Sequence, residues 1–165
     1  MFVLGIDPGL STTGYGLVET SRGVMRAVTA GVIRTDPADQ IAHRLAELER
    51  DLVGLVDEYQ IDEAALETVF VNKNRQSAMS VLRASGVALM VLGRRRIPVT
   101  EYTPSQVKAS LAGFGGADKQ QMQRMVQSRL NLPDLPRPAD AADALAIAMC
   151  HAQSLRMNRA VERAR

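Results

Sequence analysis

The sequence predicts a single α/β domain built on a mixed, five-stranded sheet. Three β-rich segments come first and are separated by short turns, which indicates an antiparallel meander. Two further strands then alternate with amphipathic helices, an order that is typical of a sheet covered by helices. The chain has 165 residues, of which 46% are hydrophobic and 23% charged, so it suits one compact domain with a substantial core.

The five predicted strands are short and rich in apolar residues. Val3 to Asp7 lacks the basic segment that precedes the apolar stretch of a signal peptide, so we interpret it as a buried strand. Ser21, Arg22 and Gly23 form the expected turn between the second and third strands. The remaining strands are expected at residues 13–19, 24–33, 63–66 and 98–102.

Two long helices are predicted from apolar residues at three- and four-residue steps. The first is expected to open at Asp36-Pro37 and to bury one stripe, composed of Ile41, Leu45, Leu48, Leu52, Leu55 and Tyr59. The second has a single apolar face, composed of Ala78, Val81, Leu82, Ser85, Ala88, Leu89 and Leu92. Gly86 lies inside this second helix, where small residues would let a helix of a second subunit approach closely.

Three more helices are expected in the C-terminal half. The first begins at Thr103-Pro104, a cap followed by a proline at the first helical position. The others cover residues 118–130 and 139–155. We expect residues 1–157 to form the domain and residues 158–165 to form a flexible basic tail.

Composition narrows the class of protein. The single Cys150 and the two histidines exclude an internal disulfide and a Cys/His zinc site. No apolar run reaches the ~18 residues of a membrane span, so a cytoplasmic protein without membrane contact is expected. The net charge is only +2, although the pI is about 9.0. Arginines cluster at residues 94–96 and in the tail; these clusters alone do not decide between solvated surface and nucleic-acid contact.

Four acidic residues stand where a catalytic site would need them. Asp7 ends the first strand, and Glu67 ends the fourth. Asp140 and Asp143 are three residues apart at the start of the last helix, so they share one helix face. Each acid alone also has a structural interpretation, since Asp140 suits a helix N-terminus and Asp7-Pro8-Gly9 suits a turn.

Taken together, the four acids favour a metal site. Carboxylates that crowd together repel one another, and a bound cation offsets that repulsion. Oxygen ligands without cysteine or histidine favour Mg²⁺, with Mn²⁺ as a substitute. Two such ions ~4 Å apart can activate water and stabilise the leaving oxygen in phosphodiester hydrolysis.

The segment from Gly5 to Gly14 also resembles a phosphate-contacting strand-turn-strand. Its glycines permit close backbone approach, and its hydroxyls at positions 11–13 can bond phosphate oxygens. It is not a Walker loop, because no Gly-Lys-Ser/Thr follows. Sugar kinases and chaperone-type ATPases have similar turns, but they close two domains around a nucleotide, and this chain is too short for that.

Three motifs resemble one nuclease family. They are the opening Leu4-Gly5-Ile6-Asp7-Pro8-Gly9 with Thr13-Gly14-Tyr15-Gly16, then Glu67-Thr68-Val69-Phe70-Val71-Asn72-Lys73-Asn74, then residues 139–148 around Asp140 and Asp143. The order and the residues of these motifs are similar to those of the RuvC-type crossover junction endodeoxyribonucleases, and the similarity covers residues 2–155. The resemblance implies an RNase H-like fold and a homodimer that resolves Holliday junctions in recombination and DNA repair by paired, symmetric, metal-dependent nicks. It also implies cooperation with a branch-migration motor.

The resemblance assigns roles to single residues. It makes Asp7, Glu67, Asp140 and Asp143 the metal-binding catalytic acids, although some family members have His in place of Asp140. Phe70 matches the family aromatic that stacks on unpaired bases at the crossover; by periodicity alone it would be a core residue. Lys108 and Lys119 match family lysines near the active site or the DNA path, and Lys73 and Arg75 are further phosphate candidates.

Two other functions stay open. One is an RNase H-like ribonuclease that trims ribosomal RNA precursors and shares the Gly-Ile-Asp-Pro-Gly opening. The other is a junction-binding protein that keeps the fold and has lost turnover. The presence of all four acids speaks against an inert protein, and the second and third motifs suit the junction resolvases better than the ribonucleases.

Overall fold

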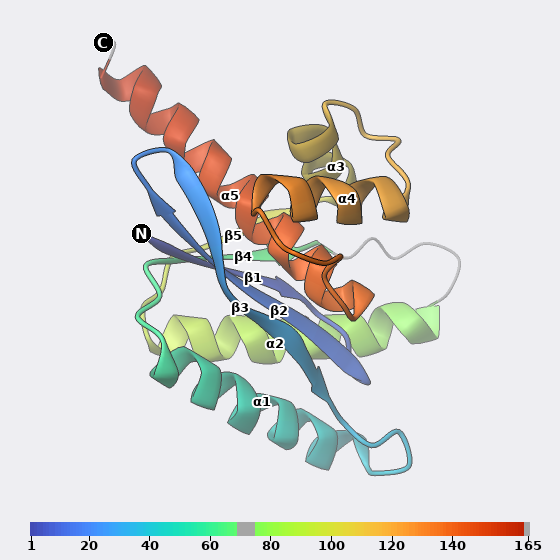
Figure 1. Cartoon of the computed structure of the whole chain (residues 1–165). Coiled ribbons are helices and arrows are strands. Elements are labelled where there is room, and N and C mark those ends of the chain that lie inside the picture. Colours follow the sequence, from blue (N-terminus) through green and yellow to red (C-terminus); the bar gives the residue numbers. More distant parts are fainter. Residues whose placement is uncertain (69–74, 164–165) are drawn as a thin grey trace.

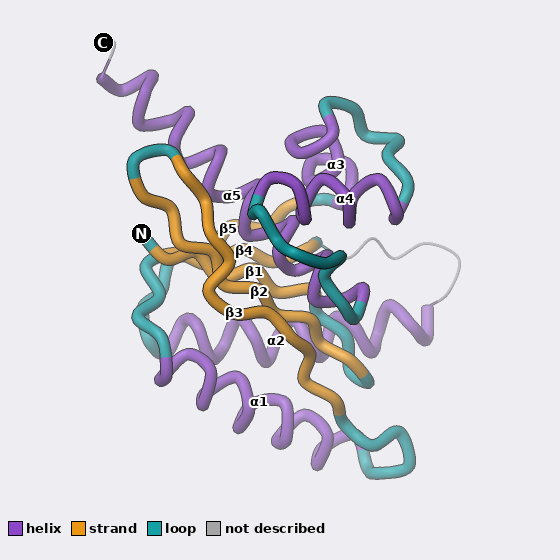
Figure 2. Tube along the Cα trace, viewed as in Figure 1, coloured by secondary structure: helices purple, strands orange, loops and turns teal. Residues whose placement is uncertain are grey.

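The structure is a computed structural model that describes residues 1–68 and 75–163, without the side chains of residues 75–77, 159 and 163. A twisted sheet forms the middle layer, with helices packed on both of its faces (Figures 1 and 2). Hydrophobic side chains fill two cores, one on each side of the sheet.

The sheet has the predicted mixed, five-stranded architecture. Its strands are β1 (Phe2–Asp7), β2 (Thr12–Ser21), β3 (Val24–Arg34), β4 (Glu63–Glu67) and β5 (Val99–Tyr102), in the order β3-β2-β1-β4-β5. β1 to β3 form the antiparallel meander, whereas β4 and β5 run parallel to β1. The carboxyl ends of β1 and β4 therefore lie side by side.

Helix α1 (Ile41–Glu58) covers one face of the sheet together with α2. It begins five residues later than predicted, because side-chain oxygens of Asp36 and Asp39 accept the backbone N–H groups of Ala38 (2.9 Å) and Gln40 (2.7 Å) and hold a turn there. The predicted stripe is only partly correct. The buried residues of α1 repeat every four positions, as Arg44, Leu48, Leu52 and Val56, while Ile41 is exposed.

Helix α2 (Arg75–Arg94) buries a narrower face than predicted. Ala84, Ala88, Val91 and Leu92 are buried against the sheet and α1, whereas Leu82 and Leu89 are exposed. The arginines that follow tie this helix to α1: Arg94 pairs with Glu49 (3.2 Å) and Arg95 with Asp57 (2.7 Å). Two arginines of the cluster at residues 94–96 therefore form ion pairs within the protein.

Helices α3 (Pro104–Ala112), α4 (Lys119–Arg129) and α5 (Ala139–Arg163) cover the other face. Gly5 and Gly16 leave space for the α5 backbone directly on the sheet; a Cβ at Gly16 would lie 2.7 Å from the amide nitrogen of Leu145. The buried His151 accepts or donates a hydrogen bond with the Tyr102 hydroxyl (2.9 Å), which joins α5 to β5.

Helix α5 continues to Arg163, past the predicted end at residue 155. Residues 156–163 contain no glycine or proline and are mostly arginine, alanine, methionine and glutamate, all of which favour helix. Residues 158–163 thus continue the helix, where we had expected the start of a flexible tail.

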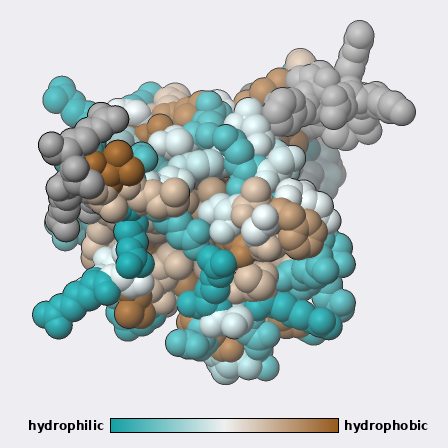
Figure 3. Space-filling model, turned by 90° about the horizontal axis from the view of Figure 1, so that it is seen from above, coloured by the Kyte–Doolittle hydropathy of each residue, from teal (hydrophilic) through white to brown (hydrophobic). Residues whose placement is uncertain are grey.

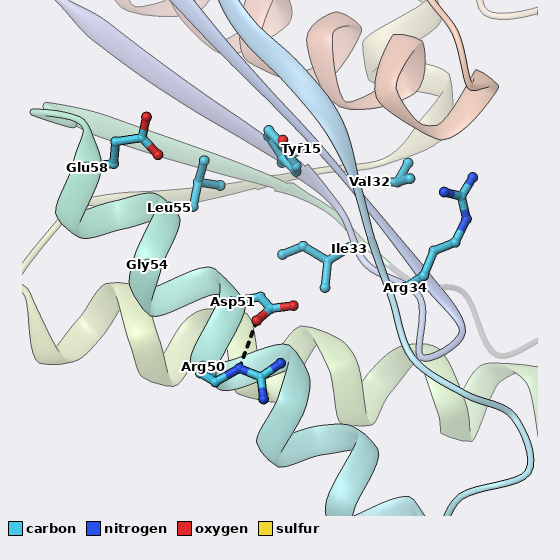
Figure 4. A pocket seen from close by; sticks show the side chains of 9 residues that line it. All are labelled: Tyr15, Val32, Ile33, Arg34, Arg50, Asp51, Gly54, Leu55 and Glu58. Carbon is cyan, nitrogen blue, oxygen red and sulfur yellow. Dashed lines mark hydrogen bonds and ion pairs between the residues drawn. The ribbon is translucent and has the colours of Figure 1, made fainter.

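One of the surface hollows lies against α1. About 430 Å³ lies between α1 and the strands β2 and β3, with Tyr15 and Ile33 pointing into it and the Arg50–Asp51 ion pair on its rim (Figure 4). None of the four predicted catalytic acids lines it. In the view from above, hydrophobic residues form spots between hydrophilic ones (Figure 3). No helix in the described part of the chain combines the length and apolar character needed to span a bilayer.

Candidate active site

Two of the four predicted acids are placed by the sheet. Ile6 pairs with Leu66 in the parallel ladder between β1 and β4, so the next residue of each strand, Asp7 and Glu67, lies at the same sheet edge. Between their first residues, Phe2 and Glu63, and these acids, both strands consist of buried residues without charge. The buried ladder therefore fixes both carboxylates at the rim of the core.

Helix α5 supplies the other two acids. Asp140 and Asp143 lie in its first turns, as predicted from their spacing. The helix can lie this close to the strands because β2 has glycine at position 14: a Cβ there would collide with the backbone carbonyl of Asp140. Gly14 thus leaves space for the start of α5.

Three of the acids converge on one point. Carboxylate oxygens of Asp7, Asp140 and Asp143 all lie within 4.8 Å of one another, a spacing at which one cation could bind all three. Glu67 lies next to this group. It lines a small cavity of about 50 Å³ together with Asp143 and Lys108. The arrangement fits a divalent cation, because every ligand is a carboxylate oxygen.

Burial and crowding raise the pKa of two of the four acids. Burial, and after it the charges of Glu67, Asp143 and Asp140, raise the pKa of Asp7 from 3.8 to about 7, although Lys119 acts in the opposite direction. Burial also raises the pKa of Glu67, with the charge of Asp143 as the next cause. The site thus disfavours negative charge, and a bound divalent cation would offset this cost.

Two predicted lysines surround the acids. Lys119, the first residue of α4, forms an ion pair with Asp143 (3.0 Å), and this bond raises the pKa of the lysine. A capping box made by Asp118 and Gln121 starts α4 at this point. Lys108 on α3 lies close enough to Glu67 for its charge to lower the pKa of that acid. Both lysines therefore belong to the same site as the acids.

The remaining predicted DNA contacts are not placed in the site. Phe70 and Lys73 lie outside the described residues, and the side chain of Arg75, the first residue of α2, is not described either. The sequence prediction missed one residue beside the site, Arg44. It is buried and hydrogen-bonded to Ser11, on the turn that follows Asp7. The burial of Arg44 could have been predicted from its position on the apolar stripe of α1, four residues before Leu48.

Comparison with known proteins identifies the family. Residues 3–151 match the family model of crossover junction endodeoxyribonuclease RuvC. The chain belongs to the RuvC family. A relative from Syntrophomonas wolfei with that name is 47% identical over 162 residues, which is 98% of this chain and 94% of the relative. Another, from Chloroflexus aggregans, is 49% identical over 152 residues, 92% of this chain and 93% of the relative.

Solved structures of the family have the same fold. RuvC from Thermus thermophilus in complex with Holliday junction substrate superposes with a TM-score of 0.90 at 34% identity, covering 96% of each chain. The yeast mitochondrial Holliday junction resolvase is 14% identical with a TM-score of 0.62, covering 90% of this chain and 77% of that one. The latter likeness shows only a shared fold. The predicted RNase H-like fold is thereby confirmed.

Proposed function

We propose that this chain is an endonuclease that resolves Holliday junctions by paired, symmetric, metal-dependent nicks in two opposed strands. The observation that carries the proposal is the convergence of Asp7, Asp140 and Asp143 within 4.8 Å, beside Glu67, in a chain of the RuvC family. The T. thermophilus relative was solved with a Holliday junction substrate and supports the choice of DNA. Homologous recombination and DNA repair are the processes that produce such junctions.

The four carboxylates would hold Mg²⁺, two ions per site, with Mn²⁺ as a substitute. When bound, such ions neutralise charge on the phosphate and lower the pKa of a water molecule. Asp7 is the central ligand, since each of the other three acids raises its pKa. Glu67 stands at the edge of the group, where it completes the ligand set.

The protein's own cations act on the substrate. Lys119 and Lys108 lie beside Asp143 and Glu67, so a phosphate above the acids would meet both ammonium groups. In-line attack by water on phosphorus would release the 3′ oxygen and leave a 5′ phosphate. The two lysines would offset the negative charge that grows on the phosphate oxygens. Phe70, Lys73 and Arg75 are proposed to contact the DNA.

Paired cleavage needs two active sites, and α2 offers a surface for a homodimer. Four of its hydrophobic side chains are between 37% and 50% exposed: Met79, Leu82, Leu89 and Met90. Gly86 has nothing within 4 Å of the position of a Cβ. The exposed positions 79, 82, 86, 89 and 93 alternate by three and four residues, a spacing that suits two helices packed along a seam.

The cellular setting follows from the same proposal. A cytoplasmic location fits a nuclease that acts on chromosomal DNA in a bacterium, and a branch-migration motor would deliver the crossover to the enzyme. The ribosomal RNA and inert-scaffold alternatives have no observation in their favour. They remain as possible outcomes of the experiment below.

The test is cleavage of a mobile four-way DNA junction. The protein is incubated with the junction, with a linear duplex of matching sequence, and with structured RNA, in Mg²⁺ or in chelator. We expect symmetric nicks in the junction only, and only with Mg²⁺. Binding without cutting would instead favour the inert scaffold. Cutting of RNA without interaction with the junction would favour the ribosomal RNA alternative.

Asp7→Asn connects the activity to the acid cluster. The amide is similar in size but carries no charge, so we expect cleavage to fall at least 1,000-fold (~4 kcal/mol) while junction binding persists. Asp51→Asn on α1 is the control, because this acid pairs with Arg50 and lines a hollow that contains none of the four acids. Unchanged cutting by Asp7→Asn would overturn the site assignment.

A further inference from the structure

A buried cation lies beneath the turn that follows Asp7. Arg44 in the first turn of α1 is only 8% exposed. Its Nε donates to the Thr35 hydroxyl (3.0 Å), and a terminal nitrogen donates to the Ser11 hydroxyl (2.7 Å). Among the described residues no carboxylate lies within ion-pair distance of this guanidinium. The neighbouring acid Asp39 is bonded to His43 instead (3.2 Å).

Burying a charge without an opposite charge in contact costs free energy, so a bound anion would stabilise Arg44. The two hydroxyls satisfy donors of the guanidinium, and the Asp39 carboxylate, which is exposed, acts on its charge without contacting it. Asp7, which precedes the turn, belongs to the acid cluster, and Asp39 is bonded to His43. The missing negative charge would therefore come from a ligand, and the ligand of this family of enzymes is a DNA strand.

The hydrogen bonds also determine where the hydroxyl protons point. Thr35 donates its proton to the backbone carbonyl of Leu10 (2.5 Å), so its oxygen accepts from Arg44 with a remaining lone pair. Ser11 likewise accepts from Arg44, because a guanidinium has donors only. Within the described chain, the proton of Ser11 has no acceptor. Ser11 is exposed, and its O–H is thus available to a ligand.

The location suits the backbone of the cleaved strand. Ser11 is four residues beyond Asp7, on the turn between β1 and β2. Thr12, the next residue, pairs with Arg34 of β3, whose side chain extends away from α1 in Figure 4. This turn therefore lies beside the strand end that carries Asp7.

We propose that Ser11 and Arg44 form a second phosphate-binding subsite, which takes a phosphate flanking the one that is cleaved. The Ser11 hydroxyl donates to a non-bridging phosphate oxygen, and Arg44 both orients that hydroxyl and supplies the matching charge. The inference rests on the proposed function, since it requires a nucleic-acid strand at the acid cluster. It adds a contact that fixes the register of the strand relative to the acids.

The first experiment measures junction binding by Ser11→Ala. Both variant and parent carry Asp7→Asn, so that the junction is bound in Mg²⁺ without being cut, and the dissociation constant is measured by fluorescence anisotropy. We expect Ser11→Ala to weaken binding about 5- to 20-fold, as for loss of a charge-assisted hydrogen bond. Ser21→Ala is the matched control. This exposed serine ends β2 at the opposite end of the hairpin, and we expect a change below twofold.

The second experiment locates the phosphate. Single phosphates on either side of the cleavage position are replaced one at a time by neutral methylphosphonates. The parent should lose affinity at one flanking position, and at that position Ser11→Ala should lose little more. Losses that add fully at every position would overturn the inference, as would junction binding by Ser11→Ala that equals the parent's.

Arg44→Lys separates orientation from folding. Lysine keeps the charge but lacks the planar fork in which separate nitrogens donate to Thr35 and Ser11. We expect weaker junction binding and a reduced methylphosphonate effect at the same flanking phosphate. A purely structural role would lower the melting temperature and leave the methylphosphonate pattern unchanged. If the parent with Asp7 intact neither binds nor cuts the junction, the proposed function fails; if only Ser11→Ala and Arg44→Lys are without effect, only this inference fails.

Discussion

The environment of Asp7 differs strongly from that of a free side chain. Burial and the charges of three neighbouring acids together raise its pKa to about 7. In an unfolded chain the same carboxyl has a pKa of ~3.9. The folded protein without metal therefore binds a proton more tightly at this position than the unfolded chain does. The catalytic position thus costs stability when it is charged.

This difference predicts how Asp7→Asn affects stability. Because the folded-state pKa is raised, the free energy of unfolding of the parent should fall as pH rises from about 4 to about 7. In chelator at pH 8, Asp7→Asn should therefore be more stable than the parent by roughly 1–3 kcal/mol. The two should converge near pH 4. Urea denaturation at both pH values measures the effect.

Added Mg²⁺ provides the control for that measurement. A cation at the acids stabilises the folded parent by binding it, so the denaturation midpoint of the parent should rise with Mg²⁺ concentration. The rise should be smaller in Asp7→Asn, which lacks the central ligand. Equal stability of the two proteins at pH 8 in chelator would show that Asp7 is not held in an unfavourable charged state.

At the scale of elements, the site depends on how closely α5 approaches the sheet. Gly5, Gly14 and Gly16 face the α5 backbone at positions where a Cβ would overlap it. This close approach sets the position of Asp140 and Asp143 relative to Asp7. Glycines that the sequence suggested as phosphate contacts are thus required by helix packing.

Gly14→Ala tests this dependence. The added methyl group would push the start of α5 away from β2, so we expect a stability loss of about 1–3 kcal/mol and a larger loss of cleavage. Gly54→Ala on α1 is the matched control: nothing lies within 4 Å of its Cβ position, and helix propensity predicts a gain of about 0.5–1 kcal/mol. Thermal melts and junction cleavage rates compare the two. Full cleavage activity in a folded Gly14→Ala would contradict the packing argument.

The sequence predicted most elements because their patterns are local. Strand ends at Asp7 and Glu67 and the helix spacing of Asp140 and Asp143 placed the acids correctly, since a parallel ladder brings equivalent strand ends together. The start of α1 was misplaced because the Asx turns at Asp36 and Asp39 compete with helix formation there. The predicted apolar faces of α1 and α2 were partly wrong because burial on these helices depends on tertiary contacts.

Those errors concern tertiary contacts, which a single sequence does not specify. Arg44 occupies a buried position that charge patterning assigns to solvent, because its partners Ser11 and Thr35 come from distant turns. Leu82 and Leu89 have the spacing of core residues but are exposed. The ion pair between Lys119 and Asp143 joins two helices whose relative position no periodicity predicts.

At the scale of the whole molecule, the exposed face of α2 predicts dimerisation. Leu82→Glu would place a charge in the proposed seam, so we expect a monomer at micromolar concentration and loss of paired nicking, with the fold retained. Sedimentation measures the mass of the parent and variant. Val24→Glu is the control, since this 68% exposed valine lies on the edge strand β3, away from α2. A parent that sediments as a monomer, with or without junction, would rule out the paired-nick model.

Helix α5 has one more consequence, for the way the enzyme loses activity. The same helix carries Asp140 and Asp143 at its start and fills the core with a run of buried residues from Ala144 to Ala152. Its amide hydrogens in that run should exchange with solvent only through global unfolding. The catalytic turn is continuous with this run, so heat should not inactivate the enzyme in a separate local step. Thermal inactivation and melting should follow one curve, and the temperature range of the reaction is then set by the stability of the core.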